Sequence, residues 1–353
     1  MCILTGCSRI GAPQGWSGGA LTEDALYIGT MDGQVRAIDL RSGELLGAFD
    51  LQGEERFRAI YGTPFVSEET VYVGGYDTLV YALPLDLRGE KWEEPLGGAI
   101  VGGPVVFEER MLIGASDGNL YAFDANEGLE LWRFQTGNKI WSTPAVSNNV
   151  VYFGSLDHNV YAVSLANGVK QWAFQTDGAV ASSPVIANGR VFIGGLDGIF
   201  YAIDADTGNE VWRFEAANWF WARPIIKGDT IFAPSLDGNL YALDIYEGRM
   251  LWKVETGGPI VGSATFVGQE FIAIPSSDGK IRIVRMNGDE LGVCNIGEDI
   301  RTSLVAKGDY IYFGVTDHSI RALHIKRNGN PDEEWVHFTD KDQSIQRGRA
   351  AAC

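Results

Sequence analysis

The sequence predicts an all-β chain, an eight-bladed β-propeller whose blades are four-stranded antiparallel sheets. Two observations predict it. A Tyr-Ala dipeptide with a tryptophan downstream recurs every 40 residues, and each repeat holds short β-branched and aromatic runs separated by turn residues. A four-stranded sheet repeated at about this period is typical of a propeller blade. All 353 residues fit one such fold, because repeat proteins grow by adding units.

The repeat is most regular in the middle of the chain. The Tyr-Ala dipeptide begins at five positions spaced by 40, which are Tyr81, Tyr121, Tyr161, Tyr201 and Tyr241. Eleven residues after each tyrosine stands a tryptophan, namely Trp92, Trp132, Trp172, Trp212 and Trp252. Less regular copies begin at Arg36, Arg282 and Arg321, at offsets of 45, 41 and 39 from their neighbours, which brings the total to eight.

One repeat shows how four strands arise. Residues 150–153 and 159–163 flank the polar pair Asp157-His158 and predict a hairpin. Several other repeats have Asp-Gly here, a dipeptide that tolerates the positive φ of tight hairpin turns. Residues 140–145 precede the hairpin as an inner strand, and the strand carrying Trp172 follows it. The predicted blades are 15–50, 58–94, 99–135, 139–175, 179–215, 219–255, 259–295 and 299–340.

The chain ends lie outside the repeats. We expect a single propeller domain at 15–340, a lead-in at 1–14 and a polar tail at 341–353, part of which could pair where the ring closes. Of the four cysteines only Cys294 lies in the folded body, so neither a disulfide framework nor a metal site is expected. Leu4-Thr5-Gly6-Cys7 resembles a lipoprotein signal, which predicts lipidation at Cys7 and export. The apolar stretch that precedes such a signal is missing.

Charge and hydropathy exclude some partners. The net charge of −18 repels phosphate backbones, so a nucleic-acid partner is not expected. No segment is apolar enough to span a bilayer, and the predicted membrane contact is through the lipid anchor alone.

The pattern Tyr-Ala-x-Asp-x-x-x-Gly-x-x-x-Trp resembles the tryptophan-docking repeat of quinoprotein dehydrogenases and their non-catalytic relatives, over roughly residues 15–340. The resemblance implies that the tryptophan of each blade packs against the neighbouring blade. Structural docking is therefore expected for Trp92, Trp132, Trp172, Trp212 and Trp252. The signature of WD40 propellers is absent.

A contact surface is predicted at the mouth of the central channel. The repeat aligns eight inner positions there, which are Trp16, Tyr61, Val101, Trp141, Ala181, Trp221, Val261 and Arg301. Aromatic and arginine side chains carry much of the binding energy in protein interfaces. The candidate binding residues are Tyr61, Trp141, Trp219, Trp221, Arg223 and Arg301. An alternative interpretation is that these rings fill the narrow end of the channel.

Catalysis is the main alternative to binding. The related dehydrogenases hold a quinone cofactor between a tryptophan and a disulfide of adjacent cysteines, beside calcium, and this sequence has no Cys-Cys pair. The constant spacing of 40 leaves no inserted loops to build a calcium site. Turn aspartates such as Asp117 and Asp197 are expected to bind backbone N–H groups. No catalytic residue, metal or cofactor is therefore predicted.

The compact repeat and the lipobox-like start together resemble the BamB family of propeller lipoproteins. That resemblance implies a monomeric, non-catalytic scaffold of the cell envelope with protein partners, on the periplasmic face of an outer membrane or on an outer surface. The family's partner-binding loop is long, whereas the nearest feature here, residues 218–223, is short. A ligand-sensing surface module and a quinoprotein enzyme remain as alternatives.

Overall fold

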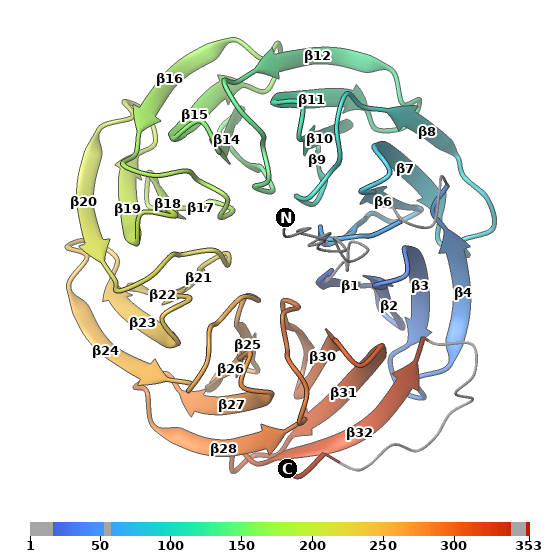
Figure 1. Ribbon diagram of the computed structural model, residues 1–353, viewed down its shortest axis with the longest axis vertical. Helices are drawn as coiled ribbons and strands as arrows, with labels where there is room; N and C mark the ends of the chain where they lie inside the picture. Colours follow the sequence, from blue (N-terminus) through green and yellow to red (C-terminus); the bar gives the residue numbers. More distant parts are fainter. Residues whose placement is uncertain (1–16, 53–57, 340–350) are drawn as a thin grey trace, which may run out of the picture.

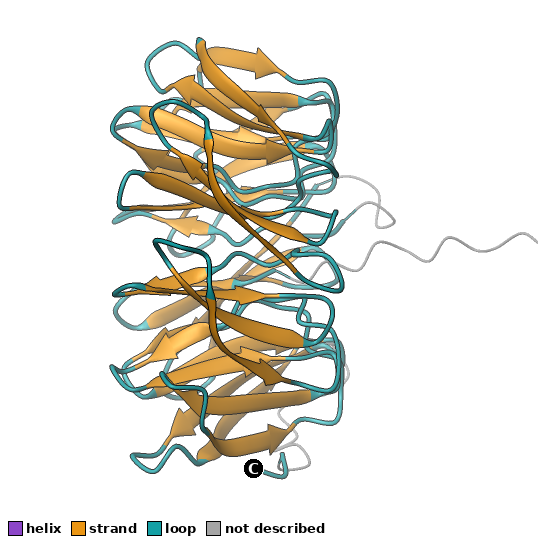
Figure 2. Cartoon of the chain, turned by 90° about the vertical axis from the view of Figure 1, so that its left-hand side faces the viewer, coloured by secondary structure: helices purple, strands orange, loops and turns teal. Residues whose placement is uncertain are grey.

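The computed structural model describes residues 17–52, 58–339 and 351–353, and the strands in these ranges form eight four-stranded antiparallel sheets. Figure 1 shows the sheets as blades around a central axis, with the first strand of each blade innermost and the fourth on the rim. Seen edge-on, the loops and turns gather on two opposite faces (Figure 2). No helix occurs in the described ranges. The predicted eight-bladed all-β propeller is confirmed.

Each blade consists of four strands that are consecutive in the chain, and the blades are numbered here in chain order. Blade 1 comprises β1 (Gly19–Leu21), β2 (Ala25–Gly29), β3 (Gln34–Asp39) and β4 (Leu45–Asp50). Blade 2 comprises β5 (Phe65–Val66), β6 (Thr70–Gly74), β7 (Leu79–Pro84) and β8 (Trp92–Pro95). Blade 3 comprises β9 (Val105–Phe107), β10 (Arg110–Gly114), β11 (Asn119–Asp124) and β12 (Glu130–Gln135). Blade 4 comprises β13 (Ala145–Ser147), β14 (Val150–Ser155), β15 (Asn159–Ser164) and β16 (Lys170–Gln175).

The second half of the ring repeats this arrangement. Blade 5 comprises β17 (Val185–Ala187), β18 (Arg190–Gly194), β19 (Ile199–Asp204) and β20 (Glu210–Glu215). Blade 6 comprises β21 (Ile225–Lys227), β22 (Thr230–Pro234), β23 (Asn239–Asp244) and β24 (Met250–Glu255). Blade 7 comprises β25 (Thr265–Val267), β26 (Phe271–Pro275), β27 (Lys280–Arg285) and β28 (Glu290–Asn295). Blade 8 comprises β29 (Val305–Lys307), β30 (Tyr310–Val315), β31 (Ser319–Ile325) and β32 (Pro331–Phe338).

The hydrophobic core lies between blades rather than at one centre. In blade 4, Val151, Tyr152 and Phe153 of β14 are all buried, because neighbouring blades cover both faces of the sheet. A strand covered on both faces carries a continuous apolar run instead of an alternating one. The outer strand β16 alternates between exposed and buried residues, because it borders solvent on the rim.

The turn between the second and third strands of each blade needs one residue at positive φ. In blade 4 this residue is His158, with a φ of 69°. The equivalent residues of the other blades also have positive φ, and they are Gly33, Thr78, Gly118, Gly198, Gly238, Gly279 and His318. Glycine adopts this conformation without steric cost, which explains its frequency at this position.

Tryptophans of the fourth strands join neighbouring blades. The indole Nε1–H of Trp132 in blade 3 donates to the carbonyl oxygen of Leu165 in blade 4 at 3.0 Å, and the indole ring lies against Gly168. A Cβ on Gly168 would stand 2.6 Å from the ring. The same bond from a fourth-strand indole to a carbonyl of the next blade is made by Trp92, Trp172, Trp212, Trp252 and Trp335.

The ring closes between blade 8 and blade 1 without exchange of a strand. Trp335 of β32 donates to the carbonyl oxygen of Leu40 at 3.0 Å, as the other tryptophans do with their own neighbours. Arg36 of β3 donates to the carbonyl oxygen of Thr339 at 2.6 Å. Lys307 of β29 donates to the carbonyl oxygen of Thr22 at 3.0 Å.

The expectation that Cys294 stands alone is wrong, because Cys294 of β28 forms a disulfide with Cys353. Residue Ala352 pairs with Asn295 at the free edge of β28, and this pairing brings the two cysteines together. The N–H of Ala351 also donates to Glu333 of β32 at 3.1 Å. The described end of the chain therefore lies across the outer strands of blades 7 and 8. The predicted lead-in and residues 341–350 of the predicted tail lie outside the described ranges.

Candidate functional site in the central channel

The described residues line a cavity of about 540 Å3 on the propeller axis. The predicted inner strand at 140–145 is wrong at its start, because β13 begins at Ala145 and the residues before it belong to no strand and bend at Ser142. Alternate residues of this segment nevertheless line the cavity. Blade 5 accordingly contributes Ala181, Ser183 and Val185 to the wall. Blades 4, 7 and 8 also contribute residues at these alternate positions, which gives the wall layers, whereas blade 6 contributes every residue from Trp221 to Ile226. A volume of this size lies within the range of small-molecule pockets.

The layer at one mouth of the cavity is rich in aromatic side chains. Of the candidate binding residues, Tyr61, Trp141, Trp221 and Arg301 lie in this layer. The ring centroids of Trp141 and Trp221 are 6.2 Å apart, although the two residues belong to the starts of different blades. Lys139 places its ammonium group 5.6 Å from the centre of the Trp141 ring. The structure thus brings together four candidates that are far apart in the sequence.

One further candidate, Trp219, is not among the residues that line the cavity. Trp219 is 47% exposed and stands on the loop that leads into blade 6, on the face where the aromatic mouth opens. Its carbonyl oxygen accepts the N–H of Leu236 at 2.8 Å, which ties this loop to the turn between β22 and β23. Trp16 and the predicted lipidation site Cys7 lie outside the described residues.

Two residues beyond the aromatic layer, side-chain hydroxyls form a second layer that we call the hydroxyl belt. It comprises Thr63, Thr143, Ser183, Ser263 and Ser303. Four of its members, Thr143, Ser183, Ser263 and Ser303, each accept a backbone N–H from the equivalent position of the preceding blade. These bonds run from Gly103 N to Thr143 Oγ1 (2.8 Å), from Thr143 N to Ser183 Oγ (2.9 Å), from Arg223 N to Ser263 Oγ (3.1 Å) and from Ser263 N to Ser303 Oγ (3.0 Å).

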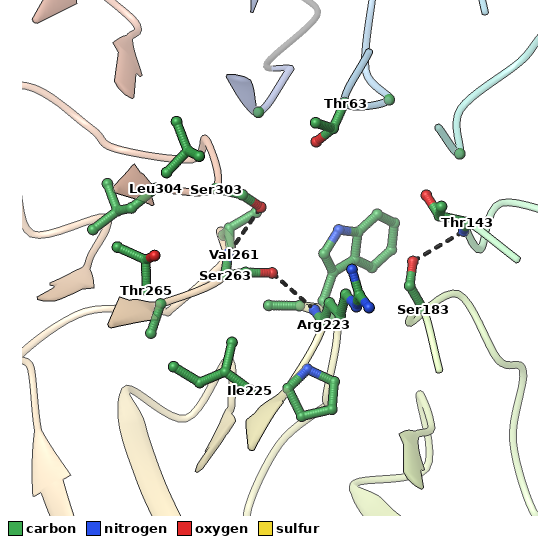
Figure 3. Close-up of a pocket in the computed structure, with 18 of the residues that line it drawn as sticks. Thr63, Thr143, Ser183, Arg223, Ile225, Val261, Ser263, Thr265, Ser303 and Leu304 are labelled. Carbon is green, nitrogen blue, oxygen red and sulfur yellow. Dashed lines mark hydrogen bonds between the residues drawn. The ribbon is translucent and has the colours of Figure 1, made fainter. Parts of the chain in front are cut away.

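Arg223 occupies one position of this belt. Figure 3 shows its side chain projecting into the space between Thr143 and Ser183 on one side and Ser263 and Ser303 on the other. The side chain is open to the channel, yet the surrounding walls withdraw it from bulk water, and this desolvation lowers the pKa of the guanidinium. An arginine therefore stands where most other blades present a small residue.

The hydroxyl belt is absent from the sequence-based site. The predicted site takes only the first inner position of each blade and includes Arg223 because it is close to Trp221 in the sequence. The signal was nevertheless present, because residues 63, 143, 183, 263 and 303 all carry Ser or Thr two positions after the aligned ring. The alternation of an extended strand would have assigned them to the same wall.

The turn aspartates are held in local structure. In blade 3, Asp117 accepts the backbone N–H of Asn119 at 3.0 Å and the hydroxyl of Tyr121 at 2.5 Å. Burial acts to raise the pKa of Asp117, but the hydrogen bonds from Tyr121 and Asn119 outweigh it, and the pKa lies below its usual value. The same tyrosine-to-aspartate bond occurs in blades 2, 4, 5 and 6. In each of these blades the turn carboxylate is an acceptor of hydrogen bonds within its own hairpin.

The residues present do not fit a quinone cofactor held as in the related dehydrogenases. The cysteine pair of the described chain, Cys294 and Cys353, lies at the outer strand β28 and not on the axis (Figure 1). No group of three His, Cys, Asp or Glu side chains in the described ranges is arranged to hold a metal ion. Within the same ranges, no helix has the length and apolar character needed to cross a bilayer.

Comparison with known proteins gives matches along nearly the whole described chain. The family model described as outer membrane protein assembly factor BamB matches residues 17–99, 79–186 and 174–338. No curated protein matches the sequence.

Solved structures share the fold at low sequence identity. The crystal structure of BamB from Moraxella catarrhalis is 16% identical, with a TM-score of 0.73 over 84% of this chain and 93% of that one. The computationally designed protein Ika8 is 18% identical, with a TM-score of 0.78 over 89% of this chain and 97% of that one. At these identities the likeness shows the fold alone, whereas the family model spans most of the sequence. The chain therefore belongs to the family of outer membrane protein assembly factor BamB.

Proposed function

We propose that this chain is a non-catalytic, monomeric scaffold of the cell envelope that binds other proteins and takes part in the assembly of outer membrane proteins. The match to the family model between residues 17 and 338 carries this proposal, because the family is described by that role. The solved BamB structure supports it through the shared propeller.

Two features support a place outside the cytoplasm. The disulfide between Cys294 and Cys353 is of a kind that persists in oxidising compartments such as the periplasm. The sequence around Cys7 resembles a lipoprotein signal, and a lipid at this cysteine would hold the propeller at a membrane while leaving it in water.

The aromatic mouth of the channel is the proposed contact surface. Trp219 is a large apolar side chain left half exposed, and it stands beside the mouth formed by Trp141 and Trp221. Tryptophan and arginine are enriched among the residues that dominate binding energy in protein interfaces. We assign Tyr61, Trp141, Trp219, Trp221, Arg223 and Arg301 to this surface.

The hydrogen bonds and ion pairs of the turn aspartates support a role without catalysis. The turn aspartates of blades 2 to 6 each accept a tyrosine hydroxyl, and those of blades 7 and 8 each pair with an arginine. A general base must instead reach a substrate proton in the channel. The cavity wall contains no Asp or Glu among the described residues.

The proposal is tested in cells of the source organism that lack this chain. We expect a lower amount of folded β-barrel protein in the outer membrane, measured by the heat-modifiable mobility of barrels on gels. The wild-type chain should restore it. The double variant W219A/W221A should restore it much less, because it removes two anchors of the contact surface.

A control variant separates surface effects from a general loss of aromatic side chains. Tyr246 is 50% exposed and lies in the turn after β23, on the opposite face of the propeller from the aromatic mouth. Y246A should restore barrel levels fully. Unchanged barrel levels in cells without the chain would refute the assembly role, and full rescue by W219A/W221A would refute the contact surface.

A further inference from the structure

The charge on the wall of the central cavity is opposite in sign to that of the whole protein. The chain carries 46 acidic and 28 basic residues, which gives its net charge of −18. The described residues that line the cavity include Arg223 and Arg301 and no Asp or Glu. A site lined by charge of one sign raises the local concentration of ligands of the other sign. The cavity is thus an electropositive pocket in an acidic molecule.

The two arginines differ in how their charge is compensated. Arg301 forms an ion pair with Asp299, with Nε and Oδ2 2.5 Å apart. The guanidinium of Arg223 forms no hydrogen bond or ion pair with any described residue, and its backbone N–H alone is bonded, to Ser263. The Arg223 side chain is exposed to the channel, so its N–H donors are open to an anion that enters the cavity. This uncompensated charge lies in the middle of a cavity large enough for a ligand.

The surroundings of Arg223 define the chemistry that would bind there. Its planar guanidinium matches a carboxylate through two parallel hydrogen bonds. The hydroxyls of Ser183 and Thr143 face the same space and can donate to the same anion (Figure 3). The wall also carries the hydroxyls of Ser263 and Ser303, and its apolar parts are the rings of Trp141 and Trp221 on one side and aliphatic groups such as Ile225 on the other. Such walls favour a flat apolar body attached to the acid.

We propose that the central channel binds a small organic carboxylate, with the acid group on the guanidinium of Arg223 and the apolar body against Trp141 and Trp221. This site goes beyond the proposed function and does not depend on it, because it requires no protein partner. One ligand per chain is expected, since one blade of the described ring contributes an arginine to the hydroxyl belt.

The variant R223S tests the site with little risk to the fold. Serine occupies the same belt position in blades 5, 7 and 8, at Ser183, Ser263 and Ser303. R223S supplies a hydroxyl that the backbone N–H of Ser183 can reach, in the manner of Thr143 and its neighbour. We therefore expect a thermal unfolding midpoint equal to or above that of the wild type. R249S is the matched control, because Arg249 lies in the same blade, outside the cavity, paired with Glu247 at 3.7 Å.

Benzoate is the probe, measured by titration calorimetry in a buffer free of other small oxyanions. Benzamide has the same shape without the charge, and inorganic phosphate carries charge without the apolar body. We expect benzoate to bind one per chain, more tightly than either comparison compound. R223S should weaken benzoate binding at least about tenfold, as the loss of hydrogen bonds between charged partners does. R249S should bind benzoate as the wild type does.

Three results would overturn the site. They are no benzoate binding in the millimolar range, benzoate affinity unchanged in R223S, and phosphate or benzamide bound as tightly as benzoate. These results concern the ligand site alone, because the assembly role is tested separately in cells that lack the chain.

Discussion

At the residue scale, one hydrogen bond is repeated around the ring and holds the hairpin turns. In blade 4 the hydroxyl of Tyr161 donates to Asp157 at 2.8 Å, and Asp157 also accepts the backbone N–H of Asn159. Blades 7 and 8 replace the tyrosine with Arg282 and Arg321, and the hydrogen bond becomes an ion pair. In blades 2 to 8 the first residue of the repeat, whether tyrosine or arginine, is therefore a donor to the turn aspartate four residues earlier.

This bond makes the stability of the propeller sensitive to alkaline pH. Burial, followed by the hydrogen bond to Asp157, raises the pKa of Tyr161 above its usual value of about 10. A group whose pKa is raised by folding contributes stability that is complete below its unfolded pKa and is lost as pH rises towards the folded pKa. The same direction holds for Tyr81, Tyr121, Tyr201 and Tyr241.

The variant Y161F tests this linkage. At pH 7 it should lower the free energy of unfolding by about 0.5–1.5 kcal/mol, because one hydrogen bond is lost. Above pH 10 the difference from wild type should shrink, because the wild-type tyrosine then loses its advantage as well. Urea unfolding followed by far-ultraviolet circular dichroism between pH 7 and 11 measures both effects. A difference that stays constant or grows with pH would contradict the assignment.

At the scale of the strand and its turns, the repeat predicts where the strands lie better than it predicts which side chains line the channel. The spacing of Tyr161 and Trp172 locates the third and fourth strands of blade 4, because a packed blade tolerates little variation in length. The hydroxyl belt was missed for a different reason. Serine and threonine are common in loops, so their presence alone indicates no site. Their place in the channel wall becomes apparent only when the alternation of an extended segment is continued two residues beyond Trp141.

The glycine before the fourth strand has a steric role that can be separated from its backbone conformation. Gly168 has a φ of 69° and lies against the ring of Trp132, whereas Gly189 has the same φ and no atom within 4 Å of an added Cβ. G189A should cost about 1 kcal/mol for the strained backbone. G168A should cost about 2–4 kcal/mol, because the methyl group also displaces the indole. Urea unfolding of the two variants measures the difference in their free energies of unfolding. Equal losses would mean that the contact between Gly168 and the Trp132 ring does not contribute to stability.

At the scale of the whole molecule, the number of blades could be predicted from the sequence, whereas the disulfide that holds the end of the chain could not. Eight copies of a repeat determine the number of sheets, because each copy carries its own four strands. The pairing of Cys294 with Cys353 depends on Ala352 lying beside the edge of β28, a contact between segments 59 residues apart that no spacing pattern encodes. Closure without strand exchange likewise follows from the sheet order and not from the repeat alone.

This closure predicts that the last interface of the ring behaves like the others. Trp335 joins blade 8 to blade 1, and Trp172 joins blade 4 to blade 5. Their exposed fractions are 9% and 8%, and their indole hydrogen bonds measure 3.0 and 2.9 Å. W335A and W172A should therefore each lower the free energy of unfolding by about 3–5 kcal/mol, as the loss of a buried indole does. Chemical unfolding of the two variants under identical conditions measures the comparison. A much smaller cost for W335A would show that other contacts hold the ring closed, since the same side chain with the same partners should contribute equally at every blade boundary.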